Sequence, residues 1–207
     1  MLDDRILVLG IGNILWADEG FGVRVVEAID RDYVMPDAVT LLDGGTQGLY
    51  LLPYLEDADI VVIVDAVDYG LPPGTLHFLS DDEVPAVLGA RKVSLHQTGF
   101  QEVLALLQLR GCAPRVLRLV GVQPHTLDDY GGGLTEVVAA QVAPAAAHVL
   151  SLLRDSFGVS PAPRTQAKEA VLAPAIARDA YEAGRPSAAD ACRIGDDRVL
   201  AHRQGDA

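Results

Sequence analysis

The chain has 207 residues, of which 50% are hydrophobic and 22% are charged, and its formal net charge is −13. This composition is typical of a soluble globular protein that is long enough for one sizeable core. The negative charge argues against a polyanion partner such as DNA, RNA or an anionic membrane, and leaves a cation, a basic peptide or simple solubility as explanations.

Apolar runs of strand length alternate with segments of helical period along the first three-quarters of the chain. The runs predict strands over Ile6–Leu9, Val39–Leu42, Ile60–Val64, Thr75–Leu79 and Val116–Val122. The helical spacing predicts helices over Gly20–Tyr33, Gln47–Glu56, Gln97–Arg110 and Thr135–Phe157, the last of which Pro144 must kink or split. Strands that alternate with helices indicate βαβ units. The expected fold class is therefore α/β, a three-layer sandwich with a mostly parallel twisted sheet and helices on both faces.

The character of the chain changes after Phe157. Ser160–Pro163 is interpreted as a linker, Thr165–Tyr181 is predicted to form an alanine-rich helix, and the polar residues 185–207 have little to bury. We therefore expect one domain over residues 1–157 and a tail over residues 158–207 that is partly helical or disordered.

Two features indicate the compartment. Cys112 and Cys192 are far apart and belong to no C-x-x-C motif, so neither a disulfide framework nor a cysteine zinc site is indicated. Met1–Asp4 is acidic where a signal peptide would be basic, and no apolar run approaches the ~18 residues of a membrane helix. These features predict a cytoplasmic protein with no membrane partner.

The stretch GIGNILWADEGFG follows the first predicted strand, where nucleotide-binding proteins hold a phosphate. Gly10 and Gly12 fit the dinucleotide fingerprint G-x-G-x-x-G, but its third glycine is replaced by Leu15, and the helix start carries Asp18 and Glu19. Acidic side chains there would repel a phosphate, so a nucleotide-binding module is a disfavoured alternative. Helix capping is the simplest explanation of the two acids, because a carboxylate at a helix N-terminus contributes about 0.3–1 kcal/mol.

Acidic residues follow three of the predicted strands, at the edge of a parallel sheet where ligands bind. They are Glu19, Asp43 and Asp65, and the last directly follows five apolar residues. Each alone could cap a helix or close a turn, and an acidic domain with no other use for them stays an alternative. Three together would repel one another unless a cation or protons bind. A loop at Ser94–Gln97 is expected to bring His96 to the same edge, where two carboxylates and an imidazole suit zinc, nickel, cobalt or manganese.

Six stretches, in this order and with short spacers, resemble the hydrogenase maturation endopeptidases: GIGNILWADEGFG, LDGGTQGLYLLPYLEDAD, VDAVDYGLPPGTL, DDEVP, SLHQTGFQEVLALL and LVGVQP. The resemblance extends from Arg5 to Phe157. It implies a peptidase, commonly grouped with the aspartic type, that removes a short C-terminal extension from the large subunit of nickel–iron hydrogenase. It also implies that nickel already bound to the precursor is the recognition signal.

The resemblance assigns roles to four residues of this sequence. The metal site of the family maps onto Glu19, Asp65 and His96, the two carboxylates are also the catalytic candidates, and Asp43 takes a supporting role. The nickel is carried by the precursor large subunit, which is the expected partner, and no organic cofactor and no nucleic acid are implied. A non-catalytic nickel-sensing chaperone, which needs the same three ligands, is the main alternative.

Two mechanisms stay open at this point. A carboxylate can act as general base on a water that attacks the scissile carbonyl, or nickel can polarise that carbonyl or activate the water. No predicted helix is apolar on two faces, so the chain alone is expected to be a monomer.

Overall fold

A five-stranded sheet in the order β3-β1-β4-β6-β5 forms the centre of the molecule. The computed structural model describes residues 4–85, 95–127, 132–166 and 183, apart from the side chains of residues 95–99. The strands are β1 (Ile6–Ile11), β3 (Val39–Gly45), β4 (Ile60–Ala66), β5 (Leu76–Ser80) and β6 (Val116–Val122). The first, second, third and last of these run parallel, while β5 pairs antiparallel with β6. The predicted mostly parallel sheet is therefore confirmed.

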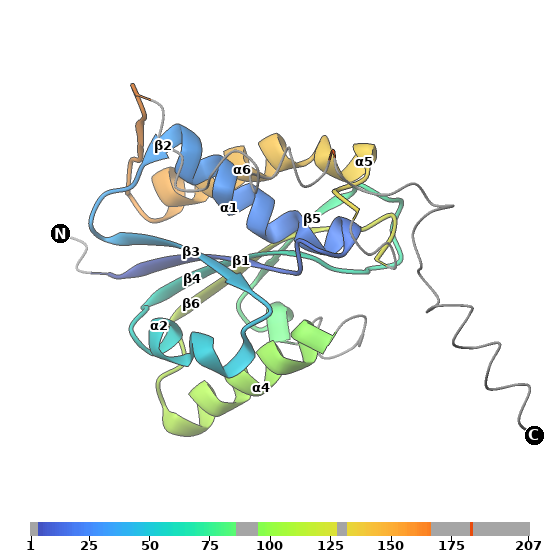
Figure 1. Cartoon of the computed structure of the whole chain (residues 1–207). Coiled ribbons are helices and arrows are strands. Elements are labelled where there is room, and N and C mark those ends of the chain that lie inside the picture. Colours follow the sequence, from blue (N-terminus) through green and yellow to red (C-terminus); the bar gives the residue numbers. More distant parts are fainter. Residues whose placement is uncertain (1–3, 86–94, 128–131, 167–182, 184–207) are drawn as a thin grey trace, which may run out of the picture.

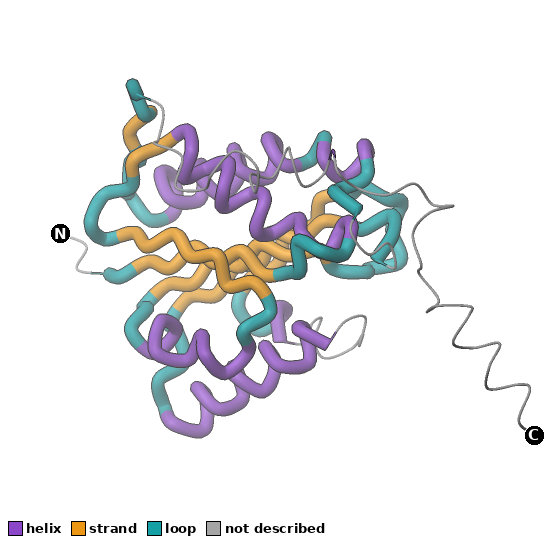
Figure 2. The backbone as a smooth tube through the Cα atoms, in the orientation of Figure 1, coloured by secondary structure: helices purple, strands orange, loops and turns teal. Residues whose placement is uncertain are grey.

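Helices cover both faces of this sheet, as Figures 1 and 2 show. One face carries α1 (Phe21–Asp32), α5 (Glu136–Ala139), α6 (Val142–Ser151) and the π-helical turn η3 (Leu152–Ser156). The other carries α2 (Leu52–Glu56) and α4 (Leu95–Arg110). The 3-10 helices η1 (Ala17–Gly20) and η2 (Gly48–Leu51) precede α1 and α2. Each face buries its own hydrophobic cluster, so the predicted three-layer sandwich is confirmed.

The helical stretch after Thr135 is divided into two, as its proline predicts. α5 ends at Ala139 and α6 begins at Val142. Pro144 therefore lies in the first turn of α6, where its missing N–H breaks no hydrogen bond within the helix.

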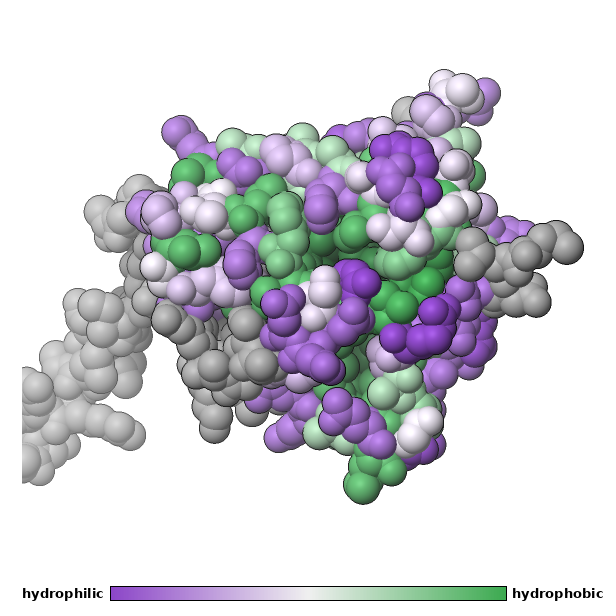
Figure 3. Space-filling model, turned by 180° about the vertical axis from the view of Figure 1, so that it is seen from behind, coloured by the Kyte–Doolittle hydropathy of each residue, from purple (hydrophilic) through white to green (hydrophobic). Residues whose placement is uncertain are grey.

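This stretch is more apolar than the sequence analysis allowed. Glu136–Ser156 has the length and hydropathy, 1.5, of a membrane-spanning helix, with 33% of its apolar window buried. The expectation that no apolar run approaches the membrane length was therefore too strict. Ala145, Val149 and Leu153 pack into the core beneath, which explains one apolar face. Seen from behind, the molecule also exposes hydrophobic residues, with hydrophilic ones between them (Figure 3).

The residues just after Phe157 remain attached to the domain. β7 (Ala162–Pro163) pairs antiparallel with β2 (Tyr33–Val34). The Arg164 N–H donates to the Asp32 carbonyl at 2.8 Å, and the Arg164 guanidinium donates to the carbonyl of Tyr33 at 3.1 Å. The linker interpretation of 160–163 was therefore wrong, because this segment is tied to the end of α1. The helix predicted over 165–181 lies outside the described residues after position 166.

The order in which successive strands are added to the sheet reverses at β1. The chain crosses from β1 through α1 to β3 on one side, and from β3 through α2 to β4 on the other side of β1. The carboxyl ends of β1 and β4 therefore flank the crevice in which open α/β sheets bind ligands. This edge of the sheet, here named the carboxyl edge, lies away from the N-terminus in Figure 1.

Candidate functional site

The turn after β1 brings Glu19 back to the carboxyl edge. Gly12 has a φ of 132°, and a Cβ atom at this position would overlap the carbonyl oxygen of Glu19. A side chain is therefore excluded at position 12, and η1 can lie directly against the end of β1. Glu19 itself is half-buried.

α1 approaches the sheet through Gly22. A Cβ atom at Gly22 would overlap the carbonyl oxygens of Val64 and Ile11. In the dinucleotide fingerprint the third glycine makes this kind of approach, and here that position is Leu15. Gly22, seven residues after Leu15, thus makes the close helix–strand contact. It does so against Val64, the residue that precedes Asp65.

Asp65 is buried at the end of β4, on the face that α4 covers. Asp65 is only 1% exposed, and its Oδ1 accepts a hydrogen bond from the Ala66 N–H at 2.8 Å. Side chains alternate between the faces of a strand, and Val61 and Ile63 belong to the cluster beneath α2 and α4. Asp65 therefore points toward that layer.

His96 is the second residue of α4, whose first turn lies toward the carboxyl edge (Figure 1). The backbone of this predicted ligand is thus on the same face as Asp65, while its side chain lies outside the description. Among the side chains that the structure does describe, no three His, Cys, Asp or Glu residues group closely enough to hold a metal ion. The predicted metal site is therefore neither confirmed nor contradicted.

Asp43 lies at the same edge but on the opposite face. It pairs in register with Gly10 and shares its face with Val39, which packs in the cluster beneath α1. Burial raises the pKa of its carboxyl, the hydrogen bond from the Gly45 N–H opposes the rise, and Glu27 of α1 adds to it. The expectation that Asp43, Glu19 and Asp65 converge was therefore wrong in part, because the sheet separates Asp43 from Asp65.

Asp18 is fully buried and has a structural role. Its Oδ2 accepts hydrogen bonds from the N–H groups of His125 and Thr126 at 2.8 and 3.0 Å. Its Oδ1 accepts from the N–H and the hydroxyl of Thr135, the N-cap of α5, at 2.7 and 3.0 Å. The helix-capping interpretation was therefore wrong for Asp18, because its carboxylate fixes the segment after β6 and the start of α5 rather than its own helix.

A run of exposed apolar residues precedes these acids, and the sequence analysis missed it. Ile14, Leu15 and Trp16 are 40, 37 and 36% exposed. Leu49 and Tyr50, in the helix that follows β3, are more exposed still. The signal was present in the sequence as an apolar run inside a turn. Such an exposed apolar surface suits the side chains of a bound polypeptide.

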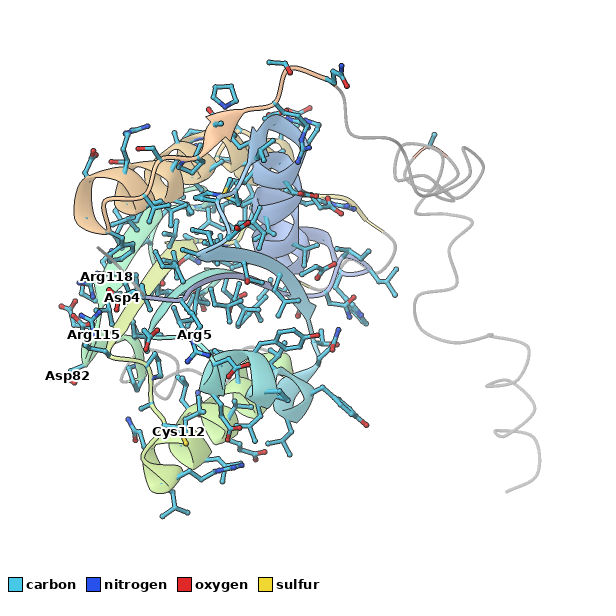
Figure 4. All side chains as sticks on the ribbon, turned by 90° about the vertical axis from the view of Figure 1, so that its left-hand side faces the viewer. Asp4, Arg5, Asp82, Cys112, Arg115 and Arg118 are labelled. Carbon is cyan, nitrogen blue, oxygen red and sulfur yellow. The ribbon has the colours of Figure 1, made fainter. Side chains whose placement is uncertain are left out.

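The two edges of the sheet differ in their charges. The connections that follow β1, β3, β4 and β6 at the carboxyl edge contain no lysine or arginine. At the opposite edge, here named the amino edge, Arg5, Arg115 and Arg118 gather near Asp4 (Figure 4). Arg115 pairs with Asp4 at 2.8 Å, and Arg118 pairs with Asp81 at 2.7 Å. The connections that follow β1, β3, β4 and β6 thus contain acidic groups and no basic ones, whereas the acids of the amino edge lie beside arginines.

A groove of about 950 Å³ lies elsewhere, between α1 and the α5–α6 layer. Arg24, Glu27, Leu134 and Ala146 are among its lining residues. It lies on the α1 side of the sheet, away from Asp65, and contains none of the predicted ligands.

Known proteins that resemble this chain fall into one family. The family model described as hydrogenase maturation protease matches residues 23–152. The hydrogenase expression/formation protein HupD of Rhodobacter capsulatus is 54% identical over 197 residues, 95% of this chain and 93% of that protein. The hydrogenase 2 maturation protease of Escherichia coli is 48% identical over 161 residues, 77% of this chain and 96% of that protein. The solved structure of the hydrogenase maturating endopeptidase HybD from E. coli superposes with a TM-score of 0.73 at 47% identity, covering 78% of this chain and 98% of that one. The chain belongs to the hydrogenase maturation protease family.

Proposed function

We propose that this protein removes the C-terminal extension of the nickel-loaded large subunit of nickel–iron hydrogenase. The observation that carries the proposal is the buried Asp65 at the switch point of the sheet, on an edge whose connections from β1, β3, β4 and β6 lack basic residues. Such an edge attracts a cation and repels a nucleotide phosphate.

The proposed ligands of the nickel are Glu19, Asp65 and His96. Two carboxylates and an imidazole fit a divalent ion of borderline hardness. The nickel is the cargo of the precursor, and its presence there is what the protease recognises. No organic cofactor is proposed.

The carboxylates also supply the chemistry of hydrolysis. Asp65 or Glu19 accepts a proton from a water molecule, the water oxygen attacks the peptide carbonyl, and the proton passes to the leaving amine as the C–N bond breaks. In this scheme the aspartic-type grouping has a physical basis, because a carboxylate is the base.

The exposed side chains of Ile14, Leu15 and Trp16 support a polypeptide substrate, since they offer apolar contacts within a few residues of Glu19. The precursor large subunit is the proposed partner, and we propose that the protease acts as a cytoplasmic monomer.

The proposal is tested by mixing the protein with a C-terminally extended large subunit, once nickel-loaded and once nickel-free, and measuring intact masses. We expect loss of a short C-terminal peptide from the nickel-loaded form alone, and no loss with Glu19→Gln. Asp57→Asn, at the amino edge where Arg5 pairs with Asp57 at 3.2 Å, is the matched control and should cleave normally.

Two results would contradict the proposal. Stable binding of the nickel-loaded subunit without loss of mass would make the protein a chaperone. Equal cleavage of both forms would remove nickel from the recognition step.

A further inference from the structure

Tyr69 places a buried hydroxyl on the face of the sheet that carries Asp65. The Tyr69 hydroxyl oxygen is shielded from solvent and makes no hydrogen bond within the part of the chain that the structure describes. Leaving a buried polar group without a partner costs free energy, so such a group calls for an explanation.

The position of this hydroxyl is defined by Gly121. Gly121 pairs in register with Asp65 on the neighbouring strand, and a Cβ atom at Gly121 would overlap the Tyr69 hydroxyl and lie 3.0 Å from two of its ring carbons. Residues paired across neighbouring strands point to the same face. The hydroxyl therefore occupies the place of a side chain at position 121, directly beside the Asp65 side chain.

The loop that carries Tyr69 is held in place by Gln123. The Gln123 Oε1 accepts hydrogen bonds from the N–H groups of Tyr69 at 2.7 Å and Leu71 at 3.1 Å, and its Nε2 donates to Asp68 at 2.9 Å. The Tyr69 ring also lies against His77, with centroids 4.7 Å apart. The hydroxyl is thus fixed where it is.

The phenol is a donor under ordinary conditions. A tyrosine hydroxyl keeps its proton at neutral pH, because the pKa of a phenol is about 10. A carboxylate has about four acceptor positions. Asp65 can therefore accept hydrogen bonds from several donors, of which the Ala66 N–H is one.

We propose that Tyr69 is a positioning residue, whose hydroxyl donates a hydrogen bond to the Asp65 carboxylate when that carboxylate binds the nickel of the precursor. This inference rests on the proposed function. Carboxylates that bind metals are oriented by such outer hydrogen bonds, and loss of one typically weakens metal affinity 10- to 100-fold. The Tyr69 hydroxyl, which has no hydrogen-bond partner in the described part of the chain, would then gain one when the nickel binds.

The test is Tyr69→Phe, with Ni²⁺ alone as the probe in calorimetric titration of the purified protein. We expect the Ni²⁺ dissociation constant to rise about 10-fold. We also expect the melting temperature of the nickel-free variant to be no lower than that of the wild type, because no hydrogen bond is lost. Tyr54→Phe, a half-exposed tyrosine in α2, undergoes the same chemical change and should leave both quantities unaltered.

The outcomes separate this inference from the proposed function. A wild-type protein that binds no Ni²⁺ would overturn this inference and the assignment of the three ligands, whereas the proposed cleavage, in which the precursor carries the nickel, is decided by the mass assay. Ni²⁺ binding by the wild type with an equal dissociation constant for Tyr69→Phe would overturn only the role of Tyr69. A lowered melting temperature with unchanged Ni²⁺ affinity would make the hydroxyl structural and would likewise overturn it.

Gly121→Ala gives a second, independent variant. Its Cβ displaces the Tyr69 hydroxyl, so it should weaken Ni²⁺ binding in the wild type by a factor similar to Tyr69→Phe. In the Tyr69→Phe background the same change should weaken binding less than 3-fold, because the two changes remove one interaction. Full additivity of the two effects would contradict the placement of the hydroxyl.

Discussion

The two edges of the same sheet use their acidic residues in opposite ways. At the amino edge, Asp4 and Asp81 lie beside Arg115 and Arg118, so each acid has a basic partner from the chain itself. At the carboxyl edge, Asp65 is buried where β4 ends, and next to it lies a tyrosine hydroxyl that has no hydrogen-bond partner among the described residues. Charges that are neutralised internally serve the fold, whereas the proposed function gives the acids of the carboxyl edge a cation that comes from outside.

The contrast also holds between adjacent residues at the carboxyl edge. Asp18 is fully buried and accepts hydrogen bonds from both the segment after β6 and the start of α5. Glu19, the next residue, is half-buried beside the crevice. Position at the edge is therefore not enough to assign a function to an acidic residue.

The largest effect is expected from Asp65→Asn. The amide keeps an acceptor for the Ala66 N–H but loses the charge and the basicity, so the cleavage rate of the nickel-loaded precursor should fall on the order of 1,000-fold. The rate is measured by intact mass against time, with circular dichroism to check the fold.

Asp81→Asn is the control for that experiment, because it removes an acid of the amino edge. Its cleavage rate should equal that of the wild type. If both variants lost activity to the same degree, the assignment of different roles to the two edges would be wrong.

Local pattern predicted most of the fold. β6 has the predicted bounds, Val116–Val122, and α1 ends one residue before its predicted end, Tyr33, because buried apolar runs and the period of a helix are properties of neighbouring residues. The sequence alone also indicated Glu19 and Asp65, since residues at the end of a parallel strand or in the turn that follows it lie at the carboxyl edge.

What the sequence could not predict depends on distant partners. Asp18 is tied to residues 125–135, more than a hundred positions away, and no local pattern records that contact. The faces of Asp43 and Asp65 depend on the register between strands. The position of Tyr69 over Gly121 depends on the pairing of β4 with β6, which no local pattern predicts.

A smaller effect, on stability rather than chemistry, is expected from Asp18→Asn. The amide nitrogen cannot accept the hydrogen bonds that one carboxylate oxygen now accepts, so partly buried N–H groups lose their partner. We expect the free energy of unfolding to fall by about 3 kcal/mol, measured by urea denaturation. Asp37→Asn, in the exposed loop before β3, should change it little.

The same variant tests the contrast between Asp18 and Glu19. The fraction of Asp18→Asn that is folded without denaturant should bind Ni²⁺ as the wild type does. A 10-fold weaker affinity in that folded fraction would place Asp18 in the site and not in the framework.

The smallest expected effect is a difference between Asp43 and Asp81 in how their contributions to stability depend on pH. Burial raises the pKa of Asp43, so its carboxyl binds a proton more tightly in the folded state, and its contribution to stability is lost as pH rises through the raised value. The hydrogen bond from the Leu117 N–H, with Arg118 beside it, lowers the pKa of Asp81, so its contribution is present at neutral pH and is lost as pH falls.

The two Asp→Asn variants should therefore change stability with opposite signs at pH 7. Asp43→Asn, which retains an acceptor for the Gly45 N–H, should stabilise the protein by about 0.5 kcal/mol or less. Asp81→Asn should destabilise it by less than about 1 kcal/mol, since its ion pair is partly exposed. Both differences should shrink near pH 3.5, where the carboxyls of the unfolded chain are largely protonated, about 0.4 below their usual pKa. Urea midpoints at the two pH values measure this. A loss of stability in both variants at pH 7 would mean that the charged carboxylate of Asp43 is stabilised in the folded protein, as that of Asp81 is. The electrostatic difference between the edges would then not extend to the α1 side of the sheet.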